Sequence, residues 1–421
     1  MMKVLWLCNV IPGPVRRALG ESSDGGFWIE HVLSGIRCQG GISLRLLCLG
    51  GEASGTLEDG TEYALFQEKK AYAYNLKLEG FFSEQLQDFQ PDVIHIWGTE
   101  YGHTLAMVNA ADKLGMLPKV VISIQGLVGI YARHMVEGLS SRVCRGKTLR
   151  DVLRGDHILR QQRDFEIRGA MEREALEKAC HVMGRTDWDR AITGQYHPDR
   201  VYHFCNETLR QSFYQGGWSY SSCKKHRIFT SSCVYPVKGF HYLLEAFVIV
   251  LKSFPDATIS VTGKSFFTSH WKERLSQQYY FREMERFCRK HGLTERIEFL
   301  GNLDAEGMKR AYLQANVFAL PSTIENSSNS LGEAMLLGVP CVAADVGGVS
   351  TMLRPGEGYV YQSTAPYMLA HYIMEVFRME ERAEEMGALA RQHALKTHAP
   401  EENLNRLLEI YREIAGEGRT Q

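Results

Sequence analysis

Short apolar runs alternate with amphipathic helical patterns along most of the chain. In the first half the apolar runs cover residues 3–8, 44–49, 93–97, 120–124 and 180–183, and helical patterns begin near Phe27 and cover residues 104–114 and 166–178. Short apolar strands separated by helices are typical of βαβ units, whose strands pair in parallel. The first half therefore predicts a doubly wound α/β domain.

A second series of the same kind starts near residue 227. Its apolar runs cover residues 227–230, 258–262, 297–300, 317–320, 341–344 and 359–361, and its helical patterns cover residues 239–253, 279–291 and 305–315. Residues 207–226 are polar, rich in Gly and Ser and aperiodic, which predicts a linker. We expect an N-terminal domain over residues 1–206, a C-terminal domain over 227–398, and a last helix within 399–421 that packs back toward the first domain.

The composition is that of a soluble globular protein of two domains. The 421 residues are 44% hydrophobic and 23% charged, within the ordinary range. A net charge of −1 argues against a nucleic-acid partner held by phosphate attraction. No apolar run reaches the roughly 20 residues of a membrane span, and the first residues lack a signal-peptide layout.

The ten cysteines are scattered and contain no C-x-x-C pair. This distribution argues against a zinc or thioredoxin-type site and indicates reduced thiols. We therefore expect a cytoplasmic protein. Peripheral contact with the inner face of a membrane stays open, and the sequence does not determine the oligomeric state.

The segment PSTIENSSNSLGEAMLLGVPCVAADVGG, residues 321–348, places two carboxylates around a polar run and the start of a helix. Glu325 follows a predicted strand, and Glu333 lies in the first turn of the helix. Ligands of such sheets bind beyond the carboxyl ends of the strands, and helix N-terminal amides attract phosphate oxygens. The arrangement suits a sugar nucleotide. The alternative is a capping box, with Ser330 at the N-cap and Glu333 reaching back to it.

Lys238 follows the first predicted strand of the second domain and opens the next helix. A cation at a helix N-terminus is mildly unfavourable to the helix dipole. Contact with a diphosphate therefore explains this lysine better than a solvated position does.

Three segments of the second half, YPVKGFH, GNLDAEGMKRAYLQANVFALPS and ENSSNSLGEAMLLG, resemble family-4 retaining glycosyltransferases, in a branch that builds bacterial polysaccharides. MKVLWLCN, PDVIHIWG and VVISIQGL resemble the first half of the same family more weakly. The resemblance implies the GT-B fold, in which two Rossmann-like α/β domains face each other across a cleft.

The resemblance also implies roles for individual residues. Glu333 would accept ribose hydroxyls, Glu325 would contact the transferred sugar, and Lys238 would neutralise the diphosphate leaving group. Further donor-binding residues would be Ser328, Asn329, Ser330, Leu331, Gly25, Gly26, Gly347 and Gly348. The family scheme requires neither a metal nor a cofactor, and its substrate would be a UDP- or GDP-sugar.

Two positions depart from the family pattern. Cys233 stands where the family has an arginine, and Gln125 stands where it has a histidine. Arg185 could replace the missing cation, or it could make an ordinary contact at a helix start. The acceptor side is expected to include residues that follow strands of the first domain: Trp97, Thr99, Glu100, Gln125, Tyr131 and His134.

We expect a metal-independent retaining glycosyltransferase that moves a hexosyl or N-acetylhexosaminyl group to a carbohydrate or lipid-linked acceptor, in polysaccharide or glycoconjugate synthesis. The alternatives are a non-catalytic sugar-nucleotide-binding subunit, which Cys233 and Gln125 motivate, and a sugar-nucleotide epimerase. Residues 142–173 hold nine Lys or Arg against five Asp or Glu. This stretch is either a solvated mixed-charge helix, the favoured interpretation, or a contact for an anionic acceptor or membrane.

Overall fold

A computed structural model describes residues 1–21, 27–68 and 72–416. Its backbone contacts divide the chain into two compact units. Unit 1 contains residues 1–130, 164–208 and the chain from 397 onward, and unit 2 contains residues 131–163 and 209–396. Each unit is built around its own sheet.

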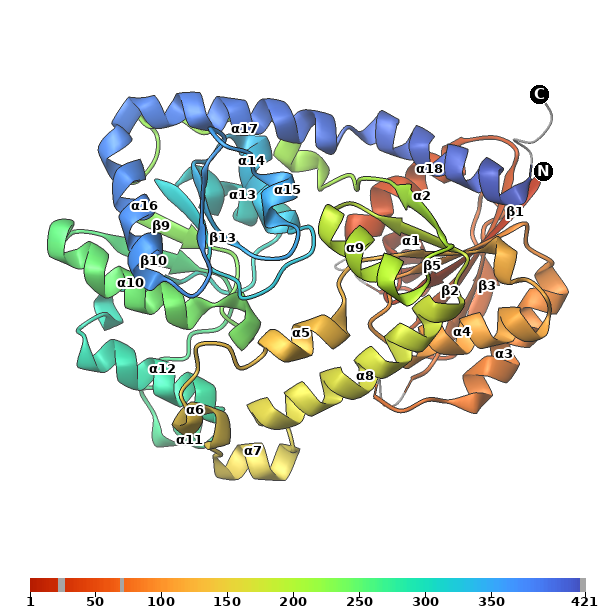
Figure 1. The fold of residues 1–421 in the computed structure, drawn as a ribbon, viewed down its shortest axis with the longest axis horizontal. Helices are drawn as coiled ribbons and strands as arrows, with labels where there is room; N and C mark the ends of the chain where they lie inside the picture. The colour runs from red at the N-terminus through yellow and green to blue at the C-terminus, as the bar shows by residue number, and fades with distance from the viewer. Residues whose placement is uncertain (22–26, 69–71, 417–421) are drawn as a thin grey trace. The chain divides into compact units, whose positions relative to one another are not determined.

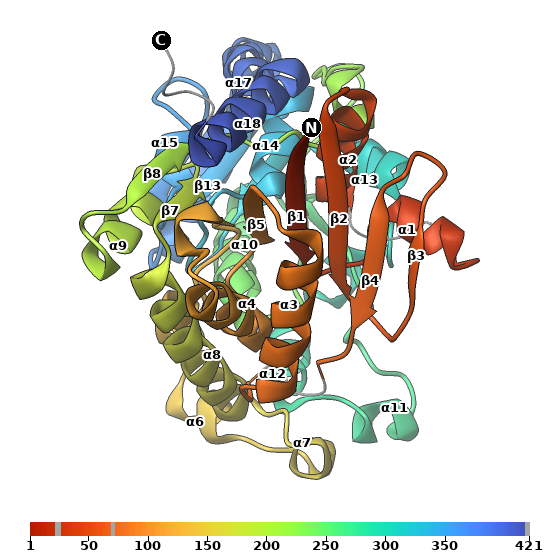
Figure 2. The same ribbon diagram turned by 90° about the vertical axis from the view of Figure 1, so that its right-hand side faces the viewer.

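The sheet of unit 1 has the strand order β3-β4-β2-β1-β5-β6-β7-β8. All neighbours pair in parallel except β3 and β4, which are antiparallel. Figure 2 shows the edge of this sheet, where β1, β2, β4 and β3 lie side by side. The strands are β1 (Met2–Cys8), β2 (Ile42–Leu49), β3 (Ser54–Thr56), β4 (Glu62–Phe66), β5 (Val93–Trp97), β6 (Val120–Ser123), β7 (His181–Gly184) and β8 (Val201–Phe204).

Two hydrophobic clusters, one with Trp6 and Ile29 and one with Phe82 and Ile96, form the core of unit 1. Alternate residues of β1 divide between them, Val4 and Trp6 to one and Leu5 and Leu7 to the other, because successive strand side chains point to opposite faces. The helices are α1 (Gly13–Ala18), α2 (Phe27–Cys38), α3 (Leu76–Phe89), α4 (Gly102–Lys113), α8 (Ile158–Lys178), α9 (Asp187–Tyr196) and α18 (Pro400–Ala415), with the 3₁₀ turn η1 (Leu117–Lys119). Two of the unit boundaries fall within α5 (Val128–His134) and α8, a third follows residue 208, and the last follows residue 396.

The sheet of unit 2 is parallel throughout, with the order β11-β10-β9-β12-β13-β14. Its strands are β9 (Arg227–Thr230), β10 (Thr258–Val261), β11 (Ile297–Phe299), β12 (Val317–Leu320), β13 (Cys341–Asp345) and β14 (Tyr359–Gln362). The chain order reverses between the central neighbours β9 and β12. Such a switch point is where parallel sheets bind ligands, and the loops after β9 and β12 contain Lys238 and Glu325.

The α-helices of unit 2 are α6 (Ser141–Arg145), α7 (Leu149–Arg154), α10 (Phe240–Ser253), α11 (Trp271–Leu275), α12 (Tyr279–Lys290), α13 (Ala305–Leu313), α14 (Asn329–Leu337), α15 (Val349–Met352), α16 (Pro366–Met379) and α17 (Ala383–Thr397). Its 3₁₀ turns are η2 (Gln211–Tyr214), η3 (Pro236–Lys238), η4 (Thr294–Arg296) and η5 (Glu380–Arg382). α10 and α16 pack against each other (Figure 1).

The last helix, α18, packs on α2 and β5 of unit 1 (Figure 1). Its Tyr411 is fully buried, and the phenol oxygen accepts a hydrogen bond from Trp6 Nε1 at 2.8 Å and lies 2.5 Å from His95 Nδ1. Burial lowers the pKa of His95 to about 3, so the imidazole is neutral. A buried polar contact thus joins the end of the chain to its first strand.

The unit boundaries differ from the predicted domains in two places. Residues 131–163 belong to unit 2, although the sequence pattern assigned them to the first domain. Residues 209–226 are also part of unit 2, where they do not act as a free linker. Phe213 and Trp218 of this segment are buried, and Trp218 Nε1 donates to the Ala315 carbonyl at 2.7 Å. Single aromatic anchors of this kind leave no periodic pattern.

The sequence pattern predicted most of the strands but missed β3, β4 and β8. It also missed several helices, α16 and α17 among them. β3 and β8 are short and half-exposed, so neither shows a continuous apolar run. Within the described chain, no helix has both the length and the apolar character needed to cross a bilayer.

Candidate functional site

Glu325 lies in the loop that follows β12 and is almost fully buried. Its Oε1 accepts hydrogen bonds from Lys238 Nζ at 2.6 Å and from Ser322 Oγ at 2.8 Å. The ion pair joins the turn after β9 to the loop after β12. Two residues 87 positions apart in the sequence are therefore in direct contact at the carboxyl edge of the sheet.

Gly239 allows the turn with Lys238 to approach this loop. Its φ is +65°, and a Cβ built there would lie only 1.7 Å from the Pro321 carbonyl oxygen. Only glycine tolerates both the left-handed backbone and this close approach. The Lys238 side chain remains about one third exposed (35%). Since an ammonium carries three N–H donors, Lys238 can bond Glu325 and still reach an anion.

The two predicted donor glycines, Gly347 and Gly348, lie behind Glu325. The Gly348 amide donates to the Glu325 carbonyl at 3.1 Å. A Cβ at Gly347, where φ is +54°, would lie 1.8 Å from the same oxygen. This glycine pair therefore holds the backbone of the Glu325 loop in place.

Helix α14 starts at Asn329, one turn before Glu333, and its N-cap is Ser328. Ser328 Oγ accepts from the Leu331 amide at 3.4 Å and lies 3.0 Å from Ser330 Oγ. The capping box with Ser330 at the N-cap is therefore wrong, because the helix begins two residues earlier than that interpretation required. The amides of this first turn form a helix N-terminus of the kind that attracts anions.

Glu333 bonds Arg210 instead of the helix end. Arg210 Nε donates to Oε1 at 2.7 Å and Nη2 donates to Oε2 at 2.6 Å, a bidentate pair. Burial raises the pKa of Glu333, and the bonds from Arg210 oppose that rise. Tyr312 lies 3.5 Å from Oε2 and donates to the Ser330 carbonyl at 2.9 Å. A carboxylate has about four acceptor positions, so Glu333 retains capacity for hydroxyl donors.

Arg210 and Tyr312 are site residues that the sequence interpretation missed. Arg210 lies in the segment that was predicted to be a linker, and Tyr312 lies inside a helix. Neither follows a strand, which was the signal used to choose candidates. The only signal that could have identified Arg210 is its positive charge in a segment without helical or strand periodicity.

Two predicted acceptor-side residues of the first domain lie instead in unit 2, beside the Glu325 loop. The Asn326 amide donates to the Tyr131 phenol oxygen at 3.1 Å, and Thr323 Oγ1 donates to the His134 carbonyl at 3.1 Å. The His134 ring itself lies 2.6 Å from Glu137 Oε2. These residues brace the loop that carries Glu325.

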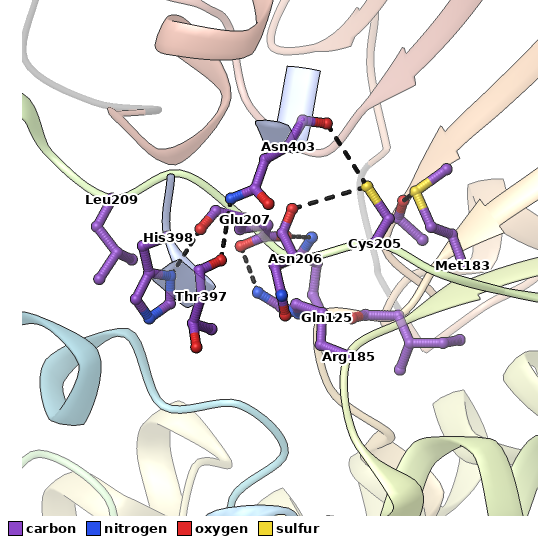
Figure 3. Close-up of polar contacts among 12 residues, drawn as sticks. Gln125, Met183, Arg185, Cys205, Asn206, Glu207, Leu209, Thr397, His398 and Asn403 are labelled. Carbon is purple, nitrogen blue, oxygen red and sulfur yellow. Dashed lines mark hydrogen bonds and ion pairs between the residues drawn. The ribbon is translucent and has the colours of Figure 1, made fainter. Parts of the chain in front are cut away.

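Gln125 and Arg185 share one partner in unit 1 (Figure 3). Arg185 Nη1 and Gln125 Nε2 each lie 2.5 Å from a carboxylate oxygen of Glu207. Arg185 Nη2 also donates to the Ile124 carbonyl at 3.2 Å. Arg185 thus neutralises a buried acid, and Gln125 helps to orient it. The geometry favours a structural role for Arg185.

The other predicted residues of unit 1 follow β5. Trp97 is buried, with its ring centroid 5.0 Å from that of Trp6. Thr99 is also buried, and its Oγ1 donates to Glu172 Oε1 at 2.5 Å. Glu172 was not predicted; it accepts the first amides of α5, and burial raises its pKa to about 8. Trp97 therefore packs in the core, and Thr99 helps to hold the Glu172 carboxylate in place.

Glu100 accepts a hydrogen bond from Asn9 Nδ2 at 3.0 Å, and burial raises its pKa. Cys233 is buried in unit 2, and burial raises the pKa of its thiol to about 12. The thiol is therefore neutral and supplies no charge for a phosphate. Gly25 and Gly26 lie outside the described residues. Among the residues that are described, no cluster of three or more His, Cys, Asp or Glu is arranged to hold a metal.

The fold is shared with proteins of known structure. Sucrose-phosphate synthase from Thermosynechococcus elongatus superposes with a TM-score of 0.69 at 15% identity, over 99% of this chain and 100% of that one. HepE of Anabaena, in complex with UDP and glucose, superposes with a TM-score of 0.65 at 16% identity, over 98% and 100%. At these identities the likeness shows the fold alone, which is the predicted GT-B class of two Rossmann-like α/β domains.

Residues 221–393 match the family model of the glycosyl transferases, group 1. The matched segment contains Lys238, Glu325 and Glu333. A GDP-mannose-dependent monoacylated alpha-(1-6)-phosphatidylinositol monomannoside mannosyltransferase from Corynebacterium glutamicum is 26% identical over 170 residues, 39% of this chain and 41% of that protein. The chain spans about two fifths of the length of that mannosyltransferase and of a D-inositol 3-phosphate glycosyltransferase from Corynebacterium urealyticum, which is 26% identical over 179 residues.

Proposed function

We propose that this protein is a retaining glycosyltransferase that moves a sugar from a UDP- or GDP-sugar to the hydroxyl of a carbohydrate or lipid-linked acceptor. The observation that carries the proposal is the contact of Lys238 with Glu325 beside the N-terminus of α14. A cation, a carboxylate and helix amides meet there, and all three belong to the group 1 segment.

Each group has a chemical task in the proposed reaction. Breaking the anomeric C–O bond leaves negative charge on the diphosphate, which the Lys238 ammonium and the first amides of α14 would stabilise. Such preorganised electrostatic stabilisation is usually the largest catalytic contribution. Glu325 would accept hydroxyls of the transferred sugar, and Glu333, already oriented by Arg210, would accept ribose hydroxyls.

The scheme uses neither a metal ion nor a covalent sugar–enzyme intermediate. Retention of configuration would follow from attack on the same face that the diphosphate leaves. The family match and the named relatives support transfer from a nucleotide sugar. The experiment below identifies the sugar, the base and the acceptor.

The test measures acceptor-dependent release of UDP or GDP from a panel of nucleotide sugars. Lys238→Ala and Glu325→Gln should each lower turnover at least about tenfold, equivalent to about 1.4 kcal/mol in the barrier. Lys252→Ala is the matched control, since Lys252 is an exposed lysine on the adjoining helix α10. Wild-type turnover by both site variants would refute the proposal.

A second candidate is a non-catalytic sugar-nucleotide-binding subunit. It is favoured by Cys233, a buried neutral thiol, and by Gln125, an amide bonded to Glu207. Calorimetric binding of a nucleotide sugar without turnover on any acceptor would support this candidate. Release of the nucleotide over many turnovers, dependent on an acceptor, would exclude it.

A further inference from the structure

Two short helices of unit 2 present apolar faces to solvent. Leu149, Val152 and Leu153 of α7 are 69%, 62% and 78% exposed, and they share one helix face because they are three and four residues apart. Trp271 and Leu275 of α11 are 68% and 51% exposed and lie four apart. We call these five residues the α7–α11 face. Grouped exposure of large apolar side chains is unusual for a soluble protein and marks an interaction surface.

Both helices are attached to the start of α12. Asp151 of α7 accepts from the Tyr279 amide at 2.9 Å, and Asp156 lies 3.4 Å from Gln278 Nε2. α11 reaches the same point through residues 276–278. In Figures 1 and 2, α7 and α11 both lie at the lower end of unit 2. The two apolar helix faces therefore belong to one end of unit 2.

A pocket of about 520 Å³ with a partly aromatic wall adjoins both helices. α7 contributes Arg150 to its wall and α11 contributes Glu273. Its aromatic lining consists of Tyr235, Phe266, Phe267, Tyr280 and Phe281. Tyr235 and its neighbour Val234 are themselves about half exposed, at 49% and 47%. Exposed apolar side chains therefore also occur at the pocket next to these helices.

Basic side chains surround the apolar face. Residues 142–163 contain seven Lys or Arg and two Asp, and both Asp already bond neighbouring groups. On α11, Glu273 is flanked by Lys272 and Arg274. The exposed basic residues of this end are Arg142, Arg145, Lys147, Arg154, Arg160, Lys272 and Arg274. The local charge is positive although the whole chain carries −1.

We propose that the α7–α11 face docks on a bilayer of anionic phospholipid. Leu, Val and Trp side chains enter the boundary between head groups and acyl chains, while the surrounding Lys and Arg contact the head groups. This combination of apolar insertion with basic residues favours an anionic membrane over a neutral apolar partner. The inference concerns binding alone and does not depend on the proposed transferase activity.

The test is flotation of the full chain with vesicles, in the absence of any nucleotide sugar. The protein should bind vesicles of phosphatidylcholine mixed with phosphatidylglycerol, and it should bind pure phosphatidylcholine far less. Added salt should weaken the binding, because it screens exposed charges. Trp271 supplies a second readout: its emission should shift to the blue with the mixed vesicles, and Trp271→Phe should remove that shift.

The decisive variant is Leu149→Ser combined with Leu153→Ser. Vesicle binding should fall at least about tenfold, since each buried leucine accounts for about that factor in partition. Leu389→Ser combined with Leu395→Ser is the matched control, because these exposed leucines lie on α17 of the same unit. The control should bind as the wild type does, and unfolding midpoints should confirm that both variants are folded.

Three outcomes would overturn the proposal. The first is that the wild type does not float with anionic vesicles. The second is that the Leu149 and Leu153 variant floats as well as its control. The third is that the wild type binds neutral and anionic vesicles equally well. A concentration-dependent dimer that the same variant dissociates, without vesicle binding, would assign the face to a second copy of the chain.

Discussion

Gly239→Ala tests whether the close approach of two backbone segments positions the ion pair of the candidate site. Gly239 has φ +65°, and an added Cβ would lie 1.7 Å from the Pro321 carbonyl oxygen and 2.5 Å from the Pro321 carbonyl carbon. Both contacts are to backbone, which cannot rotate away. The turn with Lys238 and the loop with Glu325 must therefore separate.

The expected cost has two parts. A non-glycine residue in the left-handed region costs about 1–2 kcal/mol, and forcing extra volume into a packed site typically costs about another 1–3 kcal/mol. Gly292→Ala isolates the first part, since Gly292 has φ +66° and a Cβ there would meet no atom within 4 Å. We expect a loss of about 1–2 kcal/mol for Gly292→Ala and about 2–5 kcal/mol for Gly239→Ala.

The assay combines thermal unfolding with calorimetric binding of a nucleotide sugar. For a unit of this size, 1 kcal/mol lowers the unfolding midpoint by roughly 2–4 °C. Gly239→Ala should therefore unfold at a lower temperature than Gly292→Ala and should bind the donor more weakly, whereas Gly292→Ala should bind it as the wild type does. Equal midpoints and equal donor affinities for the two variants would refute the reasoning about the close approach.

Three further predictions concern buried polar groups. Arg210→Met should lower the free energy of unfolding by about 3–5 kcal/mol at pH 8, because Glu333 would remain buried without its cation. The loss should be smaller at pH 5, because the Glu333 carboxylate takes up a proton. An equal loss at both pH values would contradict this prediction. Tyr411→Phe should cost about 1–3 kcal/mol for each of the two groups it leaves unpaired, the Trp6 indole N–H and the His95 ring nitrogen, which denaturant titration can measure. Burial lowers the pKa of His95 to about 3, so as the pH falls below 6.5 this histidine takes up a proton in the unfolded chain but not in the folded one. At pH 5 it should therefore reduce the free energy of unfolding by about 2 kcal/mol relative to pH 8. His95→Gln should remove that part of the pH dependence.

Local sequence was sufficient to predict the positions of most strands in the second unit. The apolar runs of residues 227–230, 317–320 and 341–344 coincide with β9, β12 and β13 to within a residue. Glu325 and Lys238 follow two of these strands, so their placement at one edge of a parallel sheet could be predicted. The period of a strand and the chemistry of its following turn are local properties, and the sequence contains both.

The contacts of the candidate site required the tertiary structure. Arg210, which neutralises Glu333, comes from a segment without any periodic pattern. Residues 131–163 belong to unit 2, where Tyr131 bonds the Glu325 loop. Arg185, a candidate for the missing cation, is held by Glu207 of its own unit. In each case the partner is far away in the sequence, and no local rule selects it.

The sequence by itself thus determined two α/β sheets, their strand ends and the carboxylates and lysine that follow them. Only the tertiary structure decided which charges pair, which loop braces Glu325, and which apolar helix faces remain exposed. The physical reason is the range of the interactions. Backbone periodicity depends on neighbouring residues, whereas a buried carboxylate is satisfied by whichever cation the packing of distant segments brings to it.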